Sequence, residues 1–119
     1  MARSVKQTAH IVESSKELTA SDLTKWAKAE GERLGMRLNR VNNIPVRRRK
    51  GTIEKGWADL QGYNQLGLYV AIEVKKIGDR LSKEQIERLN DVIDCGGIAF
   101  ICTQQGLNPI LNKWTKTEY

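Results

Sequence analysis

The sequence predicts an α/β domain in which helices flank a small mixed sheet. Apolar residues follow a helical period through 19–34, two β-rich apolar segments lie within 56–76, and a strand–helix–strand pattern occupies 68–102. The chain has 119 residues, the length of one domain. We expect that domain to span 19–119. An N-terminal arm at 1–18, where no sustained period is visible, should precede it.

Composition favours a cytoplasmic protein with a polyanionic partner. Lys and Arg number 20 against 14 Asp and Glu, which gives a net charge of +6. No stretch approaches the roughly 18 consecutive apolar residues of a membrane span, and the N-terminus lacks a secretory signal. Cys95 and Cys102 are expected to be reduced and buried. The only histidine, His10, lies in the arm, which disfavours histidine zinc sites and Ser–His catalysis.

The first element is predicted to be an amphipathic helix that ends at Gly35. Thr19 and Ser21 suit its N-cap, and Asp22 suits the first turn, where the helix dipole favours an acidic side chain. One apolar face has helical spacing and comprises Leu23, Trp26, Ala27 and Leu34. Glu30 falls in the middle of this face. Either the helix edge turns Glu30 to solvent, or its carboxylate is aimed at a functional site.

A short strand and a basic loop come next. Residues 36–43 alternate enough for a strand, which carries Arg37 and Arg40. Four adjacent cations follow between a proline and a glycine: Arg47, Arg48, Arg49 and Lys50. A run of charges is usually a solvated loop. Because this one precedes Asp59 so closely, we predict that it binds phosphate groups, and that Arg37 and Arg40 extend the same phosphate-binding surface.

The central segment, Gly56–Lys76, is predicted to be two strands joined by a tight connection. Asp59 stands among apolar residues of the first strand, and Glu73 and Lys75 stand within the second. Because side chains alternate along a strand, Glu73 and Lys75 point the same way, and Asp59 can meet them near the strand ends. Charges in apolar surroundings are costly unless they are paired or bound to a metal.

Two carboxylates and an ammonium group suit metal-dependent hydrolysis of a phosphodiester. Carboxylate oxygens are ligands for Mg²⁺ or Mn²⁺, and the metal polarises the phosphate and lowers the pKa of a bound water. Lys75 can position the nucleophile or stabilise the developing charge. The competing interpretation is an edge strand with a surface Glu–Lys pair.

The second half of the chain predicts a crossover. Ser82–Gln85 has the pattern of a capping box and begins a helix whose apolar face comprises Ile86, Leu89, Val92 and Ile93. Gly96 and Gly97 end this helix. The apolar run Ile98–Cys102 is predicted to be a buried strand parallel to the one that carries Glu73. Beyond residue 104, a short helix around Ile110, Leu111 and Trp114 is expected.

These motifs together resemble the PD-(D/E)XK nuclease core, and within it the small stand-alone VRR-NUC nucleases. Asp59 is followed, after thirteen residues, by Glu73-Val74-Lys75. Three further stretches agree with the family: Gly56–Leu60, Asp79–Gln85 and Gly96–Phe100. The resemblance covers roughly 21–103. The sequence departs from the family pattern at Ala58, where the family often has proline, but this position holds no metal.

The resemblance implies a restriction-endonuclease-like core and a Mg²⁺- or Mn²⁺-dependent DNA endonuclease. It implies a structure-specific enzyme for branched DNA such as a Holliday junction, acting as a homodimer. Asp59, Glu73 and the carbonyl of Val74 would bind the metal, and Lys75 would orient or activate the water. Two rival interpretations remain: a catalytically silent nucleic-acid-binding module, and a protein-interaction factor with a nuclease-like fold.

Two further residues gain a role from the resemblance. Gln85 would face the metal site from the first helical turn, in partial competition with its capping role because one amide must divide its partners. The family's acidic residue at the start of the first helix would match Asp22. The helix-face argument points instead to Glu30, so Asp22 is the expected additional metal ligand and Glu30 the alternative.

Overall fold

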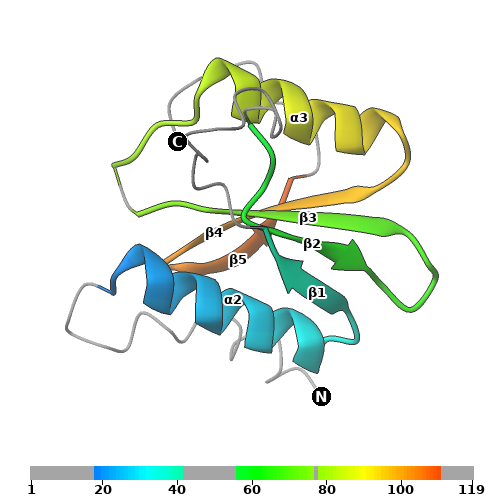
Figure 1. The fold of residues 1–119 in the computed structure, drawn as a ribbon, viewed down its shortest axis with the longest axis horizontal. Coiled ribbons are helices and arrows are strands. Elements are labelled where there is room, and N and C mark those ends of the chain that lie inside the picture. Colours follow the sequence, from blue (N-terminus) through cyan, green and yellow to red (C-terminus); the bar gives the residue numbers. More distant parts are fainter. Residues whose placement is uncertain (1–17, 42–55, 77, 111–119) are drawn as a thin grey trace, which may run out of the picture.

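The computed structural model describes residues 18–41, 56–76 and 78–110 (Figure 1). Within them, five strands form one sheet in the order β1-β2-β3-β4-β5, with one helix on each face. The elements are α2 Ala20–Arg33, β1 Arg37–Arg40, β2 Leu60–Tyr63, β3 Tyr69–Val74, α3 Lys83–Asp94, β4 Ile98–Thr103 and β5 Gly106–Pro109. β3 and β4 are parallel and the other neighbouring pairs are antiparallel. The predicted α/β class and mixed sheet are confirmed.

Helix α2 begins and ends where the sequence indicates. Thr19 is the N-cap, and its hydroxyl accepts a hydrogen bond from the backbone N–H of Asp22 at 3.1 Å. Leu34 is the C-cap, and Gly35 follows it with a φ of +97°. Of the predicted apolar face, Leu23 and Ala27 are buried against the sheet, whereas Leu34 at the C-cap is 44% exposed, contrary to the prediction. Local sequence signals therefore determine this element.

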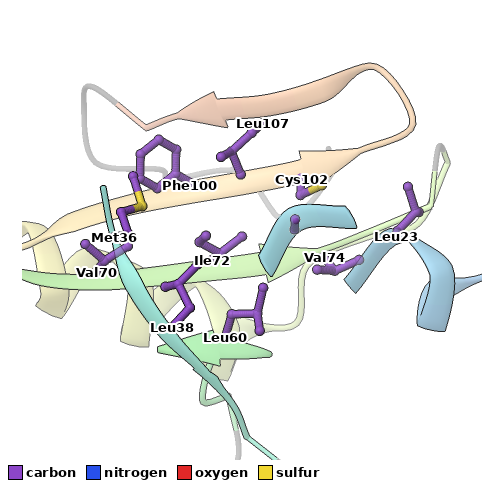
Figure 2. Close-up of a cluster of buried hydrophobic side chains, with 11 residues drawn as sticks. Leu23, Met36, Leu38, Leu60, Val70, Ile72, Val74, Phe100, Cys102 and Leu107 are labelled. Carbon is purple, nitrogen blue, oxygen red and sulfur yellow. The ribbon is translucent and has the colours of Figure 1, made fainter. Parts of the chain in front are cut away.

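Two apolar clusters hold the sheet between its helices. The cluster on the α2 side includes Leu23, Ala27, Met36, Leu38, Leu60, Val70, Ile72, Val74, Phe100, Cys102 and Leu107 (Figure 2). The cluster on the α3 side includes Ala58, Ala71, Leu81, Ile86, Leu89, Ala99, Ile101 and Ile110. Successive residues of β3 and β4 alternate between the two clusters, as side chains of a strand buried on both faces must.

The α3 crossover follows the prediction. Ser82 is the N-cap of α3 in a capping box with Gln85, and the helix packs over β3 and β4. Val70 pairs with Ile98 and Val74 with Cys102, so β4 is the predicted parallel neighbour of β3. This crossover places the first turn of α3 at the C-terminal end of β3.

One strand was not predicted, and one expectation about a cysteine was wrong. The chain after residue 104 continues as the edge strand β5, and Ile110 donates its N–H to the carbonyl of Ala99 at 2.8 Å. Pro109 argued against a strand here, because a proline cannot donate a ladder hydrogen bond and is tolerated only in edge strands such as β5. Cys95 is exposed at the C-cap of α3, whereas Cys102 is buried as expected. Leu111 and Trp114 lie outside the described residues.

Of the predicted arm, only Leu18 is described. Its N–H donates to the side-chain oxygen of Gln104 at 2.8 Å, and its side chain packs against the α2-side cluster. The chain at the predicted boundary is therefore attached to the turn between β4 and β5.

Candidate active site

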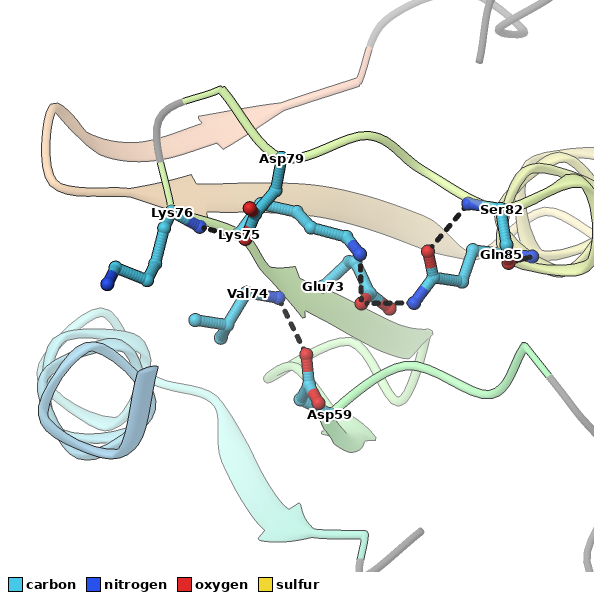
Figure 3. Close-up of polar contacts among 8 residues, drawn as sticks. All are labelled: Asp59, Glu73, Val74, Lys75, Lys76, Asp79, Ser82 and Gln85. Atoms are coloured by element: carbon cyan, nitrogen blue, oxygen red, sulfur yellow. Dashed lines mark hydrogen bonds and ion pairs between the residues drawn. The ribbon is translucent and has the colours of Figure 1, made fainter. Parts of the chain in front are cut away.

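Asp59 and Glu73 meet at one end of the β2–β3 pair. Leu60 pairs with Ile72 in the antiparallel register, so Asp59, just before β2, lies level with Glu73 on β3. The Oδ2 atom of Asp59 accepts the backbone N–H of Val74 at 2.8 Å (Figure 3). This hydrogen bond across the strands fixes the Asp59 carboxylate beside the Glu73-Val74-Lys75 segment, as the spacing predicted.

Glu73 is held in an almost fully buried position. It is 2% exposed, and its Oε2 atom accepts a hydrogen bond from Nε2 of Gln85 at 2.9 Å. The Nζ atom of Lys75 lies 4.0 Å from the same oxygen, on the same side of β3 (Figure 3). The other oxygen, Oε1, is buried and has no hydrogen-bond partner. When Glu73 is ionised, this buried acceptor without a donor is costly, and a cation would satisfy it.

Burial and mutual repulsion disfavour a negative charge on both Asp59 and Glu73 at the same time. Burial raises the pKa of Glu73 from 4.5 to about 9, with a further upward contribution from the charge of Asp59. Lys75 acts in the opposite direction and does not compensate. In the protein without metal, Glu73 is therefore protonated at neutral pH. A divalent cation between the carboxylates would favour their charged forms.

Gln85 performs both roles that the sequence allowed. Its side-chain oxygen accepts the backbone N–H of Ser82 at 2.8 Å, which completes the capping box. Its side-chain nitrogen donates to Glu73 at 2.9 Å. The expected competition does not arise, because the two ends of the amide face different partners. The same residue begins α3 and orients the buried carboxylate.

The segment before Asp59 is clamped against α3, a feature that sequence reasoning missed. Gly56 has a φ of +91°, and a Cβ there would lie 2.4 Å from the backbone oxygen of Glu84. The guanidinium carbon of Arg88 lies 4.7 Å from the centroid of the Trp57 ring, a cation–π contact. The one available signal was the aromatic residue two positions before Asp59.

The two acidic candidates on α2 lie at opposite ends of that helix. Asp22 is exposed in the first turn, near Leu23, which lies towards the Val74 end of β3 (Figure 2). Glu30 lies in the last turn and is buried, but its carboxylate pairs with the side chain of Arg33. Its neighbour Gly31 packs so closely on β1 that a Cβ there would lie 2.4 Å from Leu38 Cδ1.

The predicted basic residues are only partly placed. Arg37 and Arg40 are both exposed on β1. Arg40 pairs with Leu60, next to Asp59, whereas Arg37 pairs with Tyr63 at the far end of β2. Three residues apart on a strand, these two side chains also project from opposite faces. The loop Arg47–Lys50 lies outside the described residues.

The donor set fits a magnesium-like ion that keeps part of its water shell. Described residues contain no cluster of three or more His, Cys, Asp or Glu side chains, so neither Asp22 nor Glu30 completes an acidic triad there. Mg²⁺ is commonly held by one or two carboxylates with waters and substrate phosphate oxygens. Asp59 and the unpartnered oxygen of Glu73 supply two such carboxylates. Among the described residues, no histidine or cysteine forms a group of three with these carboxylates, so nothing there favours zinc.

Comparison with known proteins agrees with this geometry. The model of a protein family, the VRR-NUC domain, matches residues 6–105, which is most of the chain. The match begins inside the predicted arm. No curated protein matches the sequence. No helix among the described residues has the length and apolar character needed to cross a membrane.

Proposed function

Because this chain belongs to the VRR-NUC family of nuclease domains in the PD-(D/E)XK superfamily, we propose that it is a divalent-metal-dependent DNA endonuclease that hydrolyses phosphodiester bonds in branched DNA. The observation that carries the proposal is the buried carboxylate of Glu73 beside the half-buried Asp59, with Lys75 4.0 Å from Glu73. A silent binding module has no need to retain such a pair, because a raised carboxyl pKa and an unpartnered buried oxygen are costs to the fold.

Each residue of the site would have a distinct task. Asp59 and Glu73 would hold the metal, with the carbonyl of Val74 as a further ligand. The metal, when bound, supplies Lewis-acid stabilisation of the phosphate and a water of lowered pKa. Lys75 would orient the attacking water and oppose the charge on the phosphate oxygens. Gln85 would keep Glu73 turned towards the metal, since its amide already holds the Oε2 atom.

The proposal is tested by cleavage of labelled linear, flapped and four-way DNA with Mg²⁺, with Mn²⁺ and with EDTA. We expect cleavage with either metal, none in EDTA, and a preference for branched DNA. A resolvase cuts two strands symmetrically, so we also expect a homodimer in sedimentation. Strong cleavage in EDTA would contradict the metal requirement. A monomer that is active on four-way DNA would contradict the homodimeric resolvase but not the nuclease function.

Asp22 forms no three-carboxylate group with Asp59 and Glu73 in this structure, and it is proposed to join the site from the first turn of α2 when metal and DNA are bound. Asp22→Asn should slow cleavage at saturating DNA, whereas Glu30→Gln should change it little, because Glu30 is paired with Arg33 at the other end of the helix. Single-turnover rates across a Mg²⁺ titration check this, since a metal ligand also shifts the half-saturating Mg²⁺ concentration. The reverse order of effects would favour Glu30.

Arg47, Arg48, Arg49 and Lys50 are proposed to hold DNA phosphates. Each cation that neutralises a duplex phosphate adds about 0.9 to the slope of log affinity against log salt. Changing all four to alanine should therefore flatten that slope by up to about three or four units, equally for unrelated sequences. Binding is measured in EDTA at several salt concentrations. An unchanged slope would mean that the loop does not bind phosphates, and the phosphate contacts would then be sought at Arg37, Arg40, Lys76 and Arg80.

A further inference from the structure

Among the described elements, no helix packs over the β1–β2 part of the sheet on its α3 side, next to the candidate active site. Helix α3 packs over β3 and β4, whereas the side chains that β1 and β2 project towards the α3 side are exposed or half-buried. We call this surface the tyrosine face. Together with the first residue of β3, it comprises Arg37, Asn39, Gln61, Tyr63 and Tyr69.

The tyrosine face is continuous with the metal-binding carboxylates. Residues i, i+2 and i+4 of a strand share a face, so Tyr69 projects from the same side of β3 as Glu73. Tyr63 stands in the same relation to Asp59 on the neighbouring strand. Four residues of a strand span about 13 Å. This is the length of about four stacked nucleotides, or of fewer nucleotides in an extended single strand. The cross-strand pair Asn39 and Gln61 lies between the two ends.

The two tyrosines form a pair of exposed rings. Tyr63 lies directly opposite Tyr69 in the β2–β3 register, and the two are 55% and 37% exposed. Arg37 lies opposite Tyr63 on the other side, on the edge strand β1. Aromatic side chains beside a cation on an open sheet are the arrangement that binds unpaired nucleotides, with bases stacked on the rings and phosphates held by the cation.

The hairpin that carries this pair is internally braced. The side-chain oxygen of Asn64 accepts the N–H groups of Leu66 and Leu68 at 2.9 and 3.0 Å, and the Asn64 N–H donates to the carbonyl of Leu68 at 3.0 Å. The connection from Tyr63 to Tyr69 is therefore preorganised. A surface that is fixed before binding loses less conformational entropy when a ligand stacks on it.

We propose that the tyrosine face binds unpaired nucleotides of the substrate strand within a few nucleotides of the scissile phosphate, with a base stacked on Tyr63 and Tyr69 and a phosphate on Arg37. This inference rests on the proposed nuclease function and narrows its substrate to DNA with a single-stranded segment beside the cut. The net charge of +6 and the continuity with the carboxylates favour nucleic acid over a second protein chain as the occupant.

The test compares two DNA ligands in EDTA: a duplex with a single-stranded arm, and the same duplex without the arm. The adenine analogue 2-aminopurine is placed in turn at each arm position, because stacking on an aromatic ring quenches its fluorescence. We expect quenching at one or two consecutive positions near the junction. The double variant Tyr63→Leu, Tyr69→Leu should abolish the quenching and lower the affinity for the duplex with the arm by about tenfold or more. Its affinity for the duplex without the arm should be unchanged.

Matched variants separate stacking from general apolarity and from folding defects. Tyr63→Phe with Tyr69→Phe keeps both rings and should bind armed DNA as the wild type does. Leu66→Ser changes the most exposed large apolar side chain of the described residues, at 83%, without altering the rings, and should have no effect on quenching. Arg37→Gln should lower the affinity for the duplex with the arm and reduce the salt dependence of that affinity.

The outcomes distinguish this inference from the nuclease function on which it rests. Unchanged binding and quenching in the leucine variant would overturn the tyrosine face even if metal-dependent cleavage is found. A leucine variant, or Leu66→Ser, that dissociates a dimer without changing affinity for armed DNA would also overturn it, since the face would then be an interface between copies. Tyrosine-dependent quenching without cleavage in any metal would support the face and contradict the nuclease function.

Discussion

Changing Asp59, Glu73 or Lys75 to alanine is expected to lower single-turnover cleavage by about 10²–10³-fold in each case, the usual value of one positioned electrostatic group. Asp59 and Glu73 would lose a metal oxygen, and Lys75→Ala would lose the cation that lies 4.0 Å from Glu73. Because the three act on one phosphate, combined changes should cost less than the product of the single effects. Turnover near the wild-type value in any of the three would exclude that residue from the chemistry.

A control for the Lys75 variant is available on α2. Lys28→Ala also removes one positive charge, but the Lys28 side chain is 41% exposed and its partner among the described residues is Glu32, one turn away. Exposed pairs of this kind contribute little to stability. Lys28→Ala should therefore leave both the cleavage rate and DNA affinity nearly unchanged. Lys75→Ala should lose rate while keeping most of its DNA affinity, which separates a chemical role from a general effect of charge.

Without metal, the free energy of unfolding is expected to fall as the pH rises from about 4.5 to about 9. Glu73 has its pKa raised to about 9 in the folded protein from 4.5, so the folded state holds a proton that the unfolded state has released in this window. The stabilisation is complete below 4.5 and is lost as pH passes through about 9. One such proton gives a slope of up to about 1.4 kcal/mol per pH unit.

Glu73→Gln tests this dependence because glutamine resembles the protonated acid in shape and does not titrate. The variant should lose the slope that Glu73 contributes and should be more stable than the wild type at neutral pH in EDTA. Asp59→Asn keeps an oxygen for the N–H of Val74 while removing the charge that raises the pKa of Glu73, so it should reduce the slope partly. Urea unfolding at several pH values measures both, and equal slopes in all three proteins would contradict the expectation.

Saturating Mg²⁺ should cancel this pH dependence of the unfolding free energy in the wild type, because the metal holds Glu73 ionised in the folded protein. Binding of Mg²⁺ needs ionised Glu73, so each binding event releases a proton at neutral pH. Stabilisation by Mg²⁺ should therefore grow as the pH rises towards 9. Glu73→Gln should show little Mg²⁺ stabilisation at any pH.

The sequence determined by itself the order and type of most elements, because their signals are local. Thr19 and Ser82 begin their helices through hydrogen bonds to residues three positions along. The apolar runs of β3 and β4 could bury both faces only in the interior of a sheet. The spacing of Asp59, Glu73 and Lys75 likewise predicted their meeting, since an antiparallel pair joined by a short turn has few possible registers. Strand β5 was not predicted, because its four residues show neither an apolar run nor an alternating pattern.

Only the tertiary structure decided what depends on distance between segments far apart in the chain. It buried Glu73 to 2% exposure and raised its pKa, which no neighbour in sequence dictates. It let one amide of Gln85 serve both α3 and the site, and it placed Arg88 over Trp57. It also left Tyr63 and Tyr69 open to solvent. The physical reason is that periodicity and capping act within a few residues, whereas burial and charge interactions depend on the packing of α3 and β4 against β3.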